Sequence, residues 1–145
     1  MIYCLREESD VSLVSERPLV LLVEDDRDGR RLLAELLLAA GFRVEQAHNG
    51  MQALERARDL MPDAILTDLN IPGIDGYELT RRLKSDPFTS PIPVAAMTGY
   101  APFTQDPARA ERAGCAVVLC KPCDPDMLAE TLTALIMEAR GRRSA

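Results

Sequence analysis

Short apolar segments that each end at a polar residue constrain the fold of this 145-residue chain most strongly. The segments and their endings are Leu19–Val23 with Glu24, Asp25 and Asp26, Ala64–Thr67 with Asp68, Pro93–Met97 with Thr98, and Ala116–Cys120 with Lys121. Wholly apolar runs of this length are typical of strands that are covered on both faces of a parallel sheet. If these strands are neighbours, their polar endings meet at the carboxyl edge of the sheet, where open α/β sheets bind ligands.

Helical patterns separate the strands in a regular alternation. The predicted starting points of the helices are Asp26 or Asp28, Asn49, Asp75 or Gly76, Asp106-Pro107, and Asp124 or Pro125. Arg43–Ala47 is a further strand, and the fourth strand is predicted over Pro91–Met97. The pattern is (βα)5, which predicts an α/β fold with a doubly wound, five-stranded parallel sheet. Spacing alone leaves more than one strand order open.

The chain has the length of one domain. We expect an N-terminal extension over residues 1–17, the α/β domain over 18–140 and a frayed tail over 141–145. A net charge of −6 argues against binding to nucleic acid or to an anionic membrane, and short basic clusters such as Arg30–Arg31 are expected to be solvated. The sequence carries neither a signal-peptide pattern nor a bilayer-length apolar run, so we expect a cytoplasmic protein with reduced cysteines.

Four motifs, in this order along the chain, carry a resemblance to a known family. They are VLLVEDD at the first strand, TDLNIPGIDG after the third, MTGYA after the fourth and LCKP after the fifth. Together they resemble the receiver domain of response regulators in two-component signalling, over about residues 18–140. The resemblance implies a flavodoxin-like fold with strand order 2-1-3-4-5. It also implies that the chain is a stand-alone signalling module and not an enzyme. Its only chemistry would be its own phosphorylation and autodephosphorylation.

The resemblance assigns a role to each strand ending. Asp68 matches the phosphoacceptor, which would take a phosphoryl group from a histidine kinase or a phosphotransfer protein. Mg²⁺ is the implied cofactor, and the metal ligands would be Glu24, Asp25, Asp68 and the backbone carbonyl of Asn70. Thr98 and Lys121, the latter before a Pro122 that is typically cis in the family, would bind the phosphoryl oxygens. Without the cation, the carboxylates repel one another and we expect their pKa values to rise.

The sequence departs from the family where the signal is transmitted. Many receivers carry Tyr or Phe three residues before the lysine, and Val118 occupies that position here. In the family, the rate of dephosphorylation is tuned by the residue two positions after the acceptor aspartate and by the residue two positions after the threonine. These residues are Asn70 and Tyr100 here. By resemblance, a downstream protein would bind the face formed by the fourth and fifth helices and the fifth strand. The helix after Pro107, which is part of this face, is short and could change its shape. We expect a monomer or a weak homodimer.

Two other functions compete with this interpretation. Cys120 and Cys123 form a C-x-x-C pair similar to a thioredoxin-type redox motif, which would make the chain a thiol redox module. An Asp-nucleophile phosphatase would use the same Mg²⁺ chemistry. It would, however, need an acid two residues beyond Asp68, and Asn70 cannot serve as one.

Overall fold

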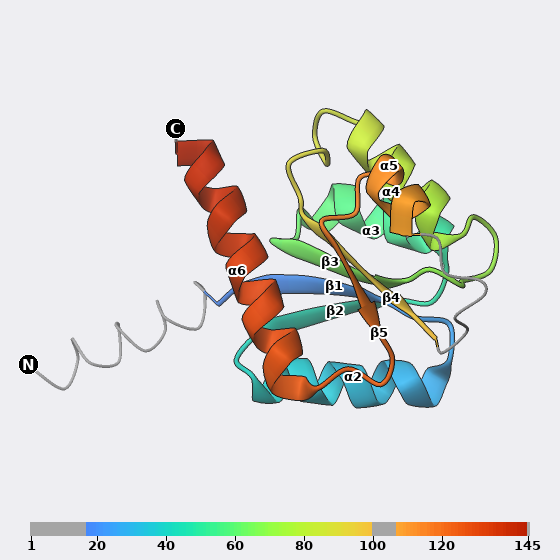
Figure 1. The fold of residues 1–145 in the computed structure, drawn as a ribbon, viewed down its shortest axis with the longest axis vertical. Coiled ribbons are helices and arrows are strands. Elements are labelled where there is room, and N and C mark those ends of the chain that lie inside the picture. The colour runs from blue at the N-terminus through green and yellow to red at the C-terminus, as the bar shows by residue number, and fades with distance from the viewer. Residues whose placement is uncertain (1–16, 100–106, 145) are drawn as a thin grey trace, which may run out of the picture.

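The computed structural model describes residues 17–99 and 107–144 of the chain. Five parallel strands form one sheet in the order β2-β1-β3-β4-β5, with helices on both faces (Figure 1). The elements are β1 (Leu19–Val23), α2 (Arg27–Ala39), β2 (Arg43–Ala47), α3 (Gly50–Leu60), β3 (Ala64–Asp68), α4 (Gly76–Ser85), β4 (Val94–Thr98), α5 (Pro107–Ala113), β5 (Val117–Cys120) and α6 (Pro125–Ser144). This arrangement confirms the predicted flavodoxin-like fold and its strand order.

Alternate residues of the strands pack into two separate cores. On one face, Val20 and Leu22 of β1 contact the core that α2 and α6 cover. On the other face, Leu21 and Val23 contact the core that α3 and α4 cover. Because both faces are covered, apolar residues are required at every position of the central strands, which explains the uninterrupted apolar runs of the sequence.

Three strands differ from their predicted bounds. β3 includes Asp68, which pairs with Met97, so the acidic residue is the last residue of the strand itself. β5 begins at Val117 and not at Ala116. β4 ends at Thr98 and not at Met97, and it begins at Val94 and not at Pro91. Proline has no N–H to donate to a sheet, and Pro93 contributes only its carbonyl, which accepts from Ile65 N at 3.0 Å. The prediction for the start of β4 was wrong for this reason.

Helix starts follow the predicted capping residues where the structure describes them. The side chains of Asp26, Asn49 and Asp75 each accept a hydrogen bond from a backbone N–H in the first turn of α2, α3 and α4. After α2 the chain turns at Gly41, whose φ of 99° favours glycine. The proposed cap Asp106 lies outside the described residues, and the helix that follows it begins at Pro107 as predicted.

The last helix is longer than the sequence pattern indicated. The tail was predicted from Gly141 onward, but α6 continues to Ser144. Basic side chains in the last turn favour the negative end of the helix dipole, and Arg142 pairs with Glu138 at 3.2 Å. These interactions outweigh the low helix propensity of one glycine. The predicted extension over residues 1–17 lies outside the described residues except for Arg17.

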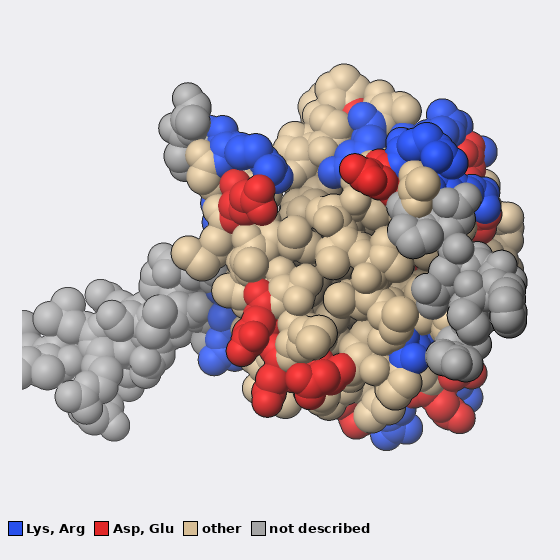
Figure 2. All heavy atoms as spheres, viewed as in Figure 1, with Lys and Arg blue, Asp and Glu red and all other residues tan. Residues whose placement is uncertain are grey.

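Charged side chains gather at the rim of the face shown in Figure 2, with basic groups over α4 and α5. Several of these arginines pair with nearby acids, as Arg81 does with Glu78 at 2.7 Å and Arg109 with Asp75 at 3.3 Å. Within residues 17–99 and 107–144, no helix has the length and apolar character needed to cross a bilayer.

Candidate functional site

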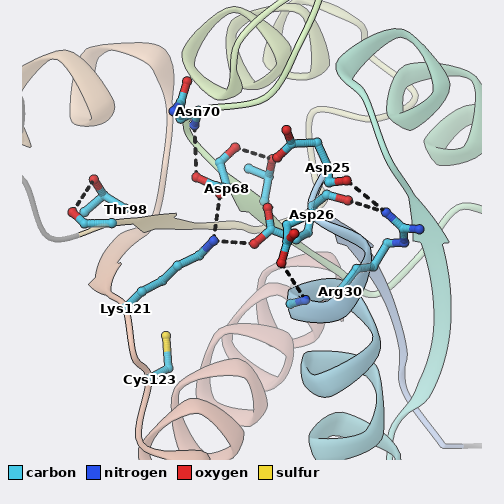
Figure 3. A network of polar contacts seen from close by, with 12 residues as sticks. Asp25, Asp26, Arg30, Asp68, Asn70, Thr98, Lys121 and Cys123 are labelled. Carbon is cyan, nitrogen blue, oxygen red and sulfur yellow. Dashed lines mark hydrogen bonds and ion pairs between the residues drawn. The ribbon is translucent and has the colours of Figure 1, made fainter.

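Three strand ends bring Glu24, Asp68 and Lys121 into direct contact. Glu24 follows β1, Asp68 ends β3, and Lys121 follows β5, so the three side chains converge at the carboxyl edge of the sheet. Figure 3 shows Lys121 pointing toward Asp68. The Lys121 ammonium donates to Asp68 Oδ2 at 2.7 Å and also to Glu24 Oε1. The Lys121–Pro122 peptide bond is cis, as the resemblance implied. The lysine, which follows β5, therefore bridges carboxylates from β1 and β3.

The carboxylates form a cluster with the composition of a cation site. Ligand atoms of Glu24, Asp25 and Asp68 all lie within 4.8 Å of one another. Glu24 is 2% exposed and Asp68 is 7% exposed, whereas Asp25 is exposed to solvent. Glu24 Oε2 is buried without a hydrogen-bond partner. An orphaned carboxylate oxygen beside two further carboxylates suits a hard divalent cation such as Mg²⁺, so these residues fit the predicted metal.

The pKa of Glu24 reflects this crowding. Burial raises the pKa from its ordinary value of 4.5 to about 7; the Lys121 ammonium opposes the shift, and the neighbouring Asp68 carboxylate adds to it. For Glu24 the direction agrees with the prediction, but burial is the largest cause and the neighbouring Asp68 carboxylate is a smaller one. A cation at the cluster would favour the ionised form and reverse the shift.

The remaining predicted residues lie around this cluster in different ways. The backbone N–H of Asn70 donates to Asp68 Oδ1 at 3.0 Å, so both oxygens of Asp68 accept hydrogen bonds. The Thr98 hydroxyl donates to the Gly99 carbonyl at 3.4 Å, and the Thr98 carbonyl accepts from Lys121 N at 2.8 Å. Figure 3 shows Thr98, the last residue of β4, near Lys121. Tyr100 lies outside the described residues.

Arg30 contributes to the site in a way that the sequence analysis missed. Its guanidinium donates to the backbone carbonyl of Glu24 at 2.9 Å and to that of Asp25 at 3.4 Å. The prediction of a solvated Arg30–Arg31 pair is therefore wrong for Arg30, which is half-buried, although Arg31 is exposed. The sequence held no signal for this role, because the groups that Arg30 binds are backbone carbonyls, which every residue carries.

Gly76 is a second residue that the sequence analysis did not assign to the site. A Cβ atom at Gly76 would lie 2.6 Å from the Asp68 carbonyl oxygen and 2.6 Å from Leu69 Cα. The Gly76 N–H also donates to the Leu69 carbonyl at 2.9 Å. The start of α4 is therefore held directly against the backbone of the acidic residue, an approach that only glycine permits.

Cys123 of the C-x-x-C pair lacks the thiol activation that a redox enzyme needs. Burial raises the pKa of the Cys123 thiol, with Lys121 opposing the shift. Thioredoxin-type sites instead lower a thiol pKa at a helix N-terminus, and Cys123 precedes α6, which begins at Pro125. These observations disfavour a catalytic thiol redox module.

The fold and the site together define a class of protein. An open α/β sheet with three carboxylates and a lysine at its carboxyl edge carries the donors that a divalent cation and a phosphoryl group require. The family model described as the response regulator receiver domain matches residues 20–133. The chain therefore belongs to the response regulator receiver family and is a receiver domain of two-component signalling.

Individual relatives agree with this assignment. The polar-differentiation response regulator DivK of Brucella anthropi is 34% identical over 120 residues, which cover 83% of this chain and 97% of DivK. The receiver domain of sensor histidine kinase PA1611 from Pseudomonas aeruginosa, solved with a magnesium ion in its active site cleft, is 31% identical with a TM-score of 0.76, covering 83% of this chain and 98% of that one. A CheY-like receiver from Methanospirillum hungatei, 22% identical with a TM-score of 0.79, covers 88% of this chain and 99% of that one and shows the same fold.

Proposed function

We propose that Asp68 accepts a phosphoryl group from a histidine kinase or a phosphotransfer protein, in a reaction that depends on Mg²⁺. The observation that carries this proposal is the bridge from the Lys121 ammonium to Asp68 Oδ2 and Glu24 Oε1. It supports a role for Asp68 because the lysine's positive charge lies 2.7 Å from one oxygen of the carboxylate that would attack the phosphorus.

Each residue of the site has its own role in the phosphoryl transfer. A carboxylate oxygen of Asp68 attacks the phosphorus, and the bond from phosphorus to the donor nitrogen breaks. The Lys121 ammonium stabilises the negative charge on the phosphoryl oxygens, and the Thr98 hydroxyl, on the strand between Asp68 and Lys121, donates to one of them. Positioning and charge neutralisation are sufficient for this chemistry, so the protein needs no general base.

Glu24, Asp25, Asp68 and the backbone carbonyl of Asn70 would hold the cation. When bound, Mg²⁺ supplies further positive charge toward the phosphoryl oxygens. The orphaned Glu24 Oε2 supports this assignment, as does the magnesium ion in the related PA1611 receiver. The metal also explains why three carboxylates are kept within 4.8 Å of one another despite their repulsion.

The output would be a phosphorylation-dependent contact with another protein. The face formed by α5, β5 and α6 is the proposed docking surface, and catalysis on an external substrate is not part of the function. Val118 lies in β5 opposite Ala96 of β4, so no aromatic side chain is available at that position to turn inward when Thr98 moves. We infer that transmission here depends on another element of this face.

An intact-mass measurement tests the proposal. The protein is incubated with acetyl phosphate and Mg²⁺, with Asp68→Asn as the test variant and Asp63→Asn, at the opposite edge of the sheet, as the matched control. We expect one phosphoryl adduct in the wild type and in the control, and none in Asp68→Asn or in EDTA. An unmodified wild type, or an equal adduct in Asp68→Asn, would contradict the proposal.

A further inference from the structure

Two cysteines flank Lys121, the residue that bridges the acidic cluster. Cys120 ends β5, Cys123 lies two residues before α6, and the structure shows no disulfide bond between them. The Cys123 thiol donates to the Cys120 carbonyl, with 3.6 Å between sulfur and oxygen. Figure 3 shows the Cys123 side chain below Lys121 on the same loop. One sulfur of the pair therefore already contacts the backbone of the other cysteine.

The two thiols differ in access to solvent. Cys120 is exposed, whereas Cys123 is half-buried and packs against the core that α2 and α6 cover. Burial shields the Cys123 thiol from a reagent in solution and raises its pKa, which lowers its reactivity further. An oxidant therefore reaches Cys120 first, and Cys123 is placed to resolve the product.

A bond between the two sulfurs would displace the loop that holds Lys121. Val117 and Leu119 pack against the same core as Cys123, so the alternation of the strand places the Cys120 side chain on the opposite face. Bringing the sulfurs together requires backbone movement between residues 120 and 123. Lys121 lies within this segment, and its backbone N–H donates to the Thr98 carbonyl at 2.8 Å.

We propose that Cys120 and Cys123 form a reversible disulfide that withdraws the Lys121 ammonium from Asp68 and so suppresses phosphoryl acceptance. The effect on phosphorylation rests on the function proposed above. A disulfide that strains its surroundings is also easier to reduce, which suits a regulatory bond more than a structural one.

The oxidant belongs to the class of low-molecular-weight disulfides, such as oxidised glutathione. The Cys120 thiolate attacks one glutathione sulfur, the glutathione disulfide bond breaks, and one glutathione thiolate leaves. The Cys123 thiol then loses its proton and attacks the Cys120 sulfur of the mixed disulfide, which releases the second glutathione. Two cysteine thiols are oxidised to one disulfide, and one glutathione disulfide is reduced to two thiols.

The experiment uses the full chain in a Cys4→Ser, Cys115→Ser background, which retains only the two cysteines in question. After treatment with oxidised glutathione, we expect the intact mass to fall by two hydrogen atoms. The rate of Mg²⁺-dependent adduct formation with acetyl phosphate should fall by about 10²-fold and return with dithiothreitol. Adding Cys120→Ser or Cys123→Ser should abolish both the disulfide and the loss of rate.

A second readout needs no phosphodonor. Because oxidation moves the loop, hydrogen exchange at the Lys121 amide should accelerate in the oxidised protein and remain slow in the serine variants. Stable glutathione adducts without an internal disulfide, or an internal disulfide with unchanged Lys121 exchange, would overturn the proposal. If the reduced protein forms no phosphoryl adduct, the proposed phosphorylation of Asp68 is refuted instead. In that case, hydrogen exchange at the Lys121 amide still decides whether the disulfide moves the loop.

Discussion

Replacing Glu24 by glutamine should change how the stability of the metal-free protein depends on pH. Glu24 is 2% exposed, and its Oε2 atom has no hydrogen-bond partner. Burial raises the pKa of this carboxyl from 4.5 to about 7 in the folded protein. In the unfolded chain the carboxyl is hydrated, and its pKa returns to its ordinary value.

The size of the effect follows from the shift in pKa. Between pH 4.5 and about 7, the folded protein retains a proton that the unfolded chain has lost. The free energy of unfolding therefore falls as pH rises through this window and is constant above it. At about 1.4 kcal/mol for each unit of pKa, the carboxyl lowers the free energy of unfolding by about 3 kcal/mol at pH 8 relative to pH 4. Glutamine at this position is neutral throughout and lacks this contribution.

Urea denaturation in EDTA, followed from pH 4 to pH 8, measures the difference. We expect Glu24→Gln to gain about 3 kcal/mol relative to the wild type as pH rises, with most of the gain complete by pH 7. Glu35→Gln is the control, because Glu35 is exposed on α2 and forms only a surface pair with Arg31. Stability curves of wild type and Glu24→Gln that stay parallel across this range would refute the reasoning.

Other substitutions test separate parts of the structure. Gly76→Ala should lower the free energy of unfolding by about 1–3 kcal/mol in thermal denaturation, because its Cβ meets backbone atoms at 2.6 Å. Gly141→Ala, in open space on α6, should raise this free energy by about 0.5–1 kcal/mol. A stabilised Gly76→Ala together with a destabilised Gly141→Ala would contradict this account. Asp26→Ala should cost about 1 kcal/mol through loss of the α2 cap, and an unchanged urea midpoint would be inconsistent with that cap. Lys121→Ala should raise the pKa of Glu24 further in a carbon-13 NMR titration, since the ammonium now opposes the shift; a lower pKa would count against the bridge.

The alternation of apolar runs and helical patterns was sufficient to predict most of the fold. β1 and β2 have the predicted bounds, since each is a run of strand-forming residues between clear turn signals. The start of β4 was misplaced because apolar character does not reveal which residues can donate to a ladder, and Pro93 cannot. α6 extends past its predicted end because Arg142 and Arg143 in its last turn stabilise the helix beyond Gly141, the residue at which the tail was predicted to begin.

The site could be predicted only in its list of acidic and basic residues. Strand endings placed Glu24, Asp68 and Lys121 at one edge, and the structure brings these three side chains together. Contacts that depend on three-dimensional placement were not predictable from spacing. Arg30 binds backbone carbonyls, which have no signature in the sequence, and the fit of Gly76 against β3 depends on how closely α4 approaches the sheet.

The central claim is that Asp68 is the residue that carries the phosphoryl group. It is tested most directly by treating the protein with acetyl phosphate and Mg²⁺, reducing the acyl phosphate with borohydride, and locating the resulting homoserine by peptide mass spectrometry. The account predicts homoserine at position 68 and at no other acidic residue of the cluster. Homoserine at Asp25 or Asp26 in place of Asp68, or its complete absence from a protein that forms the adduct, would contradict it.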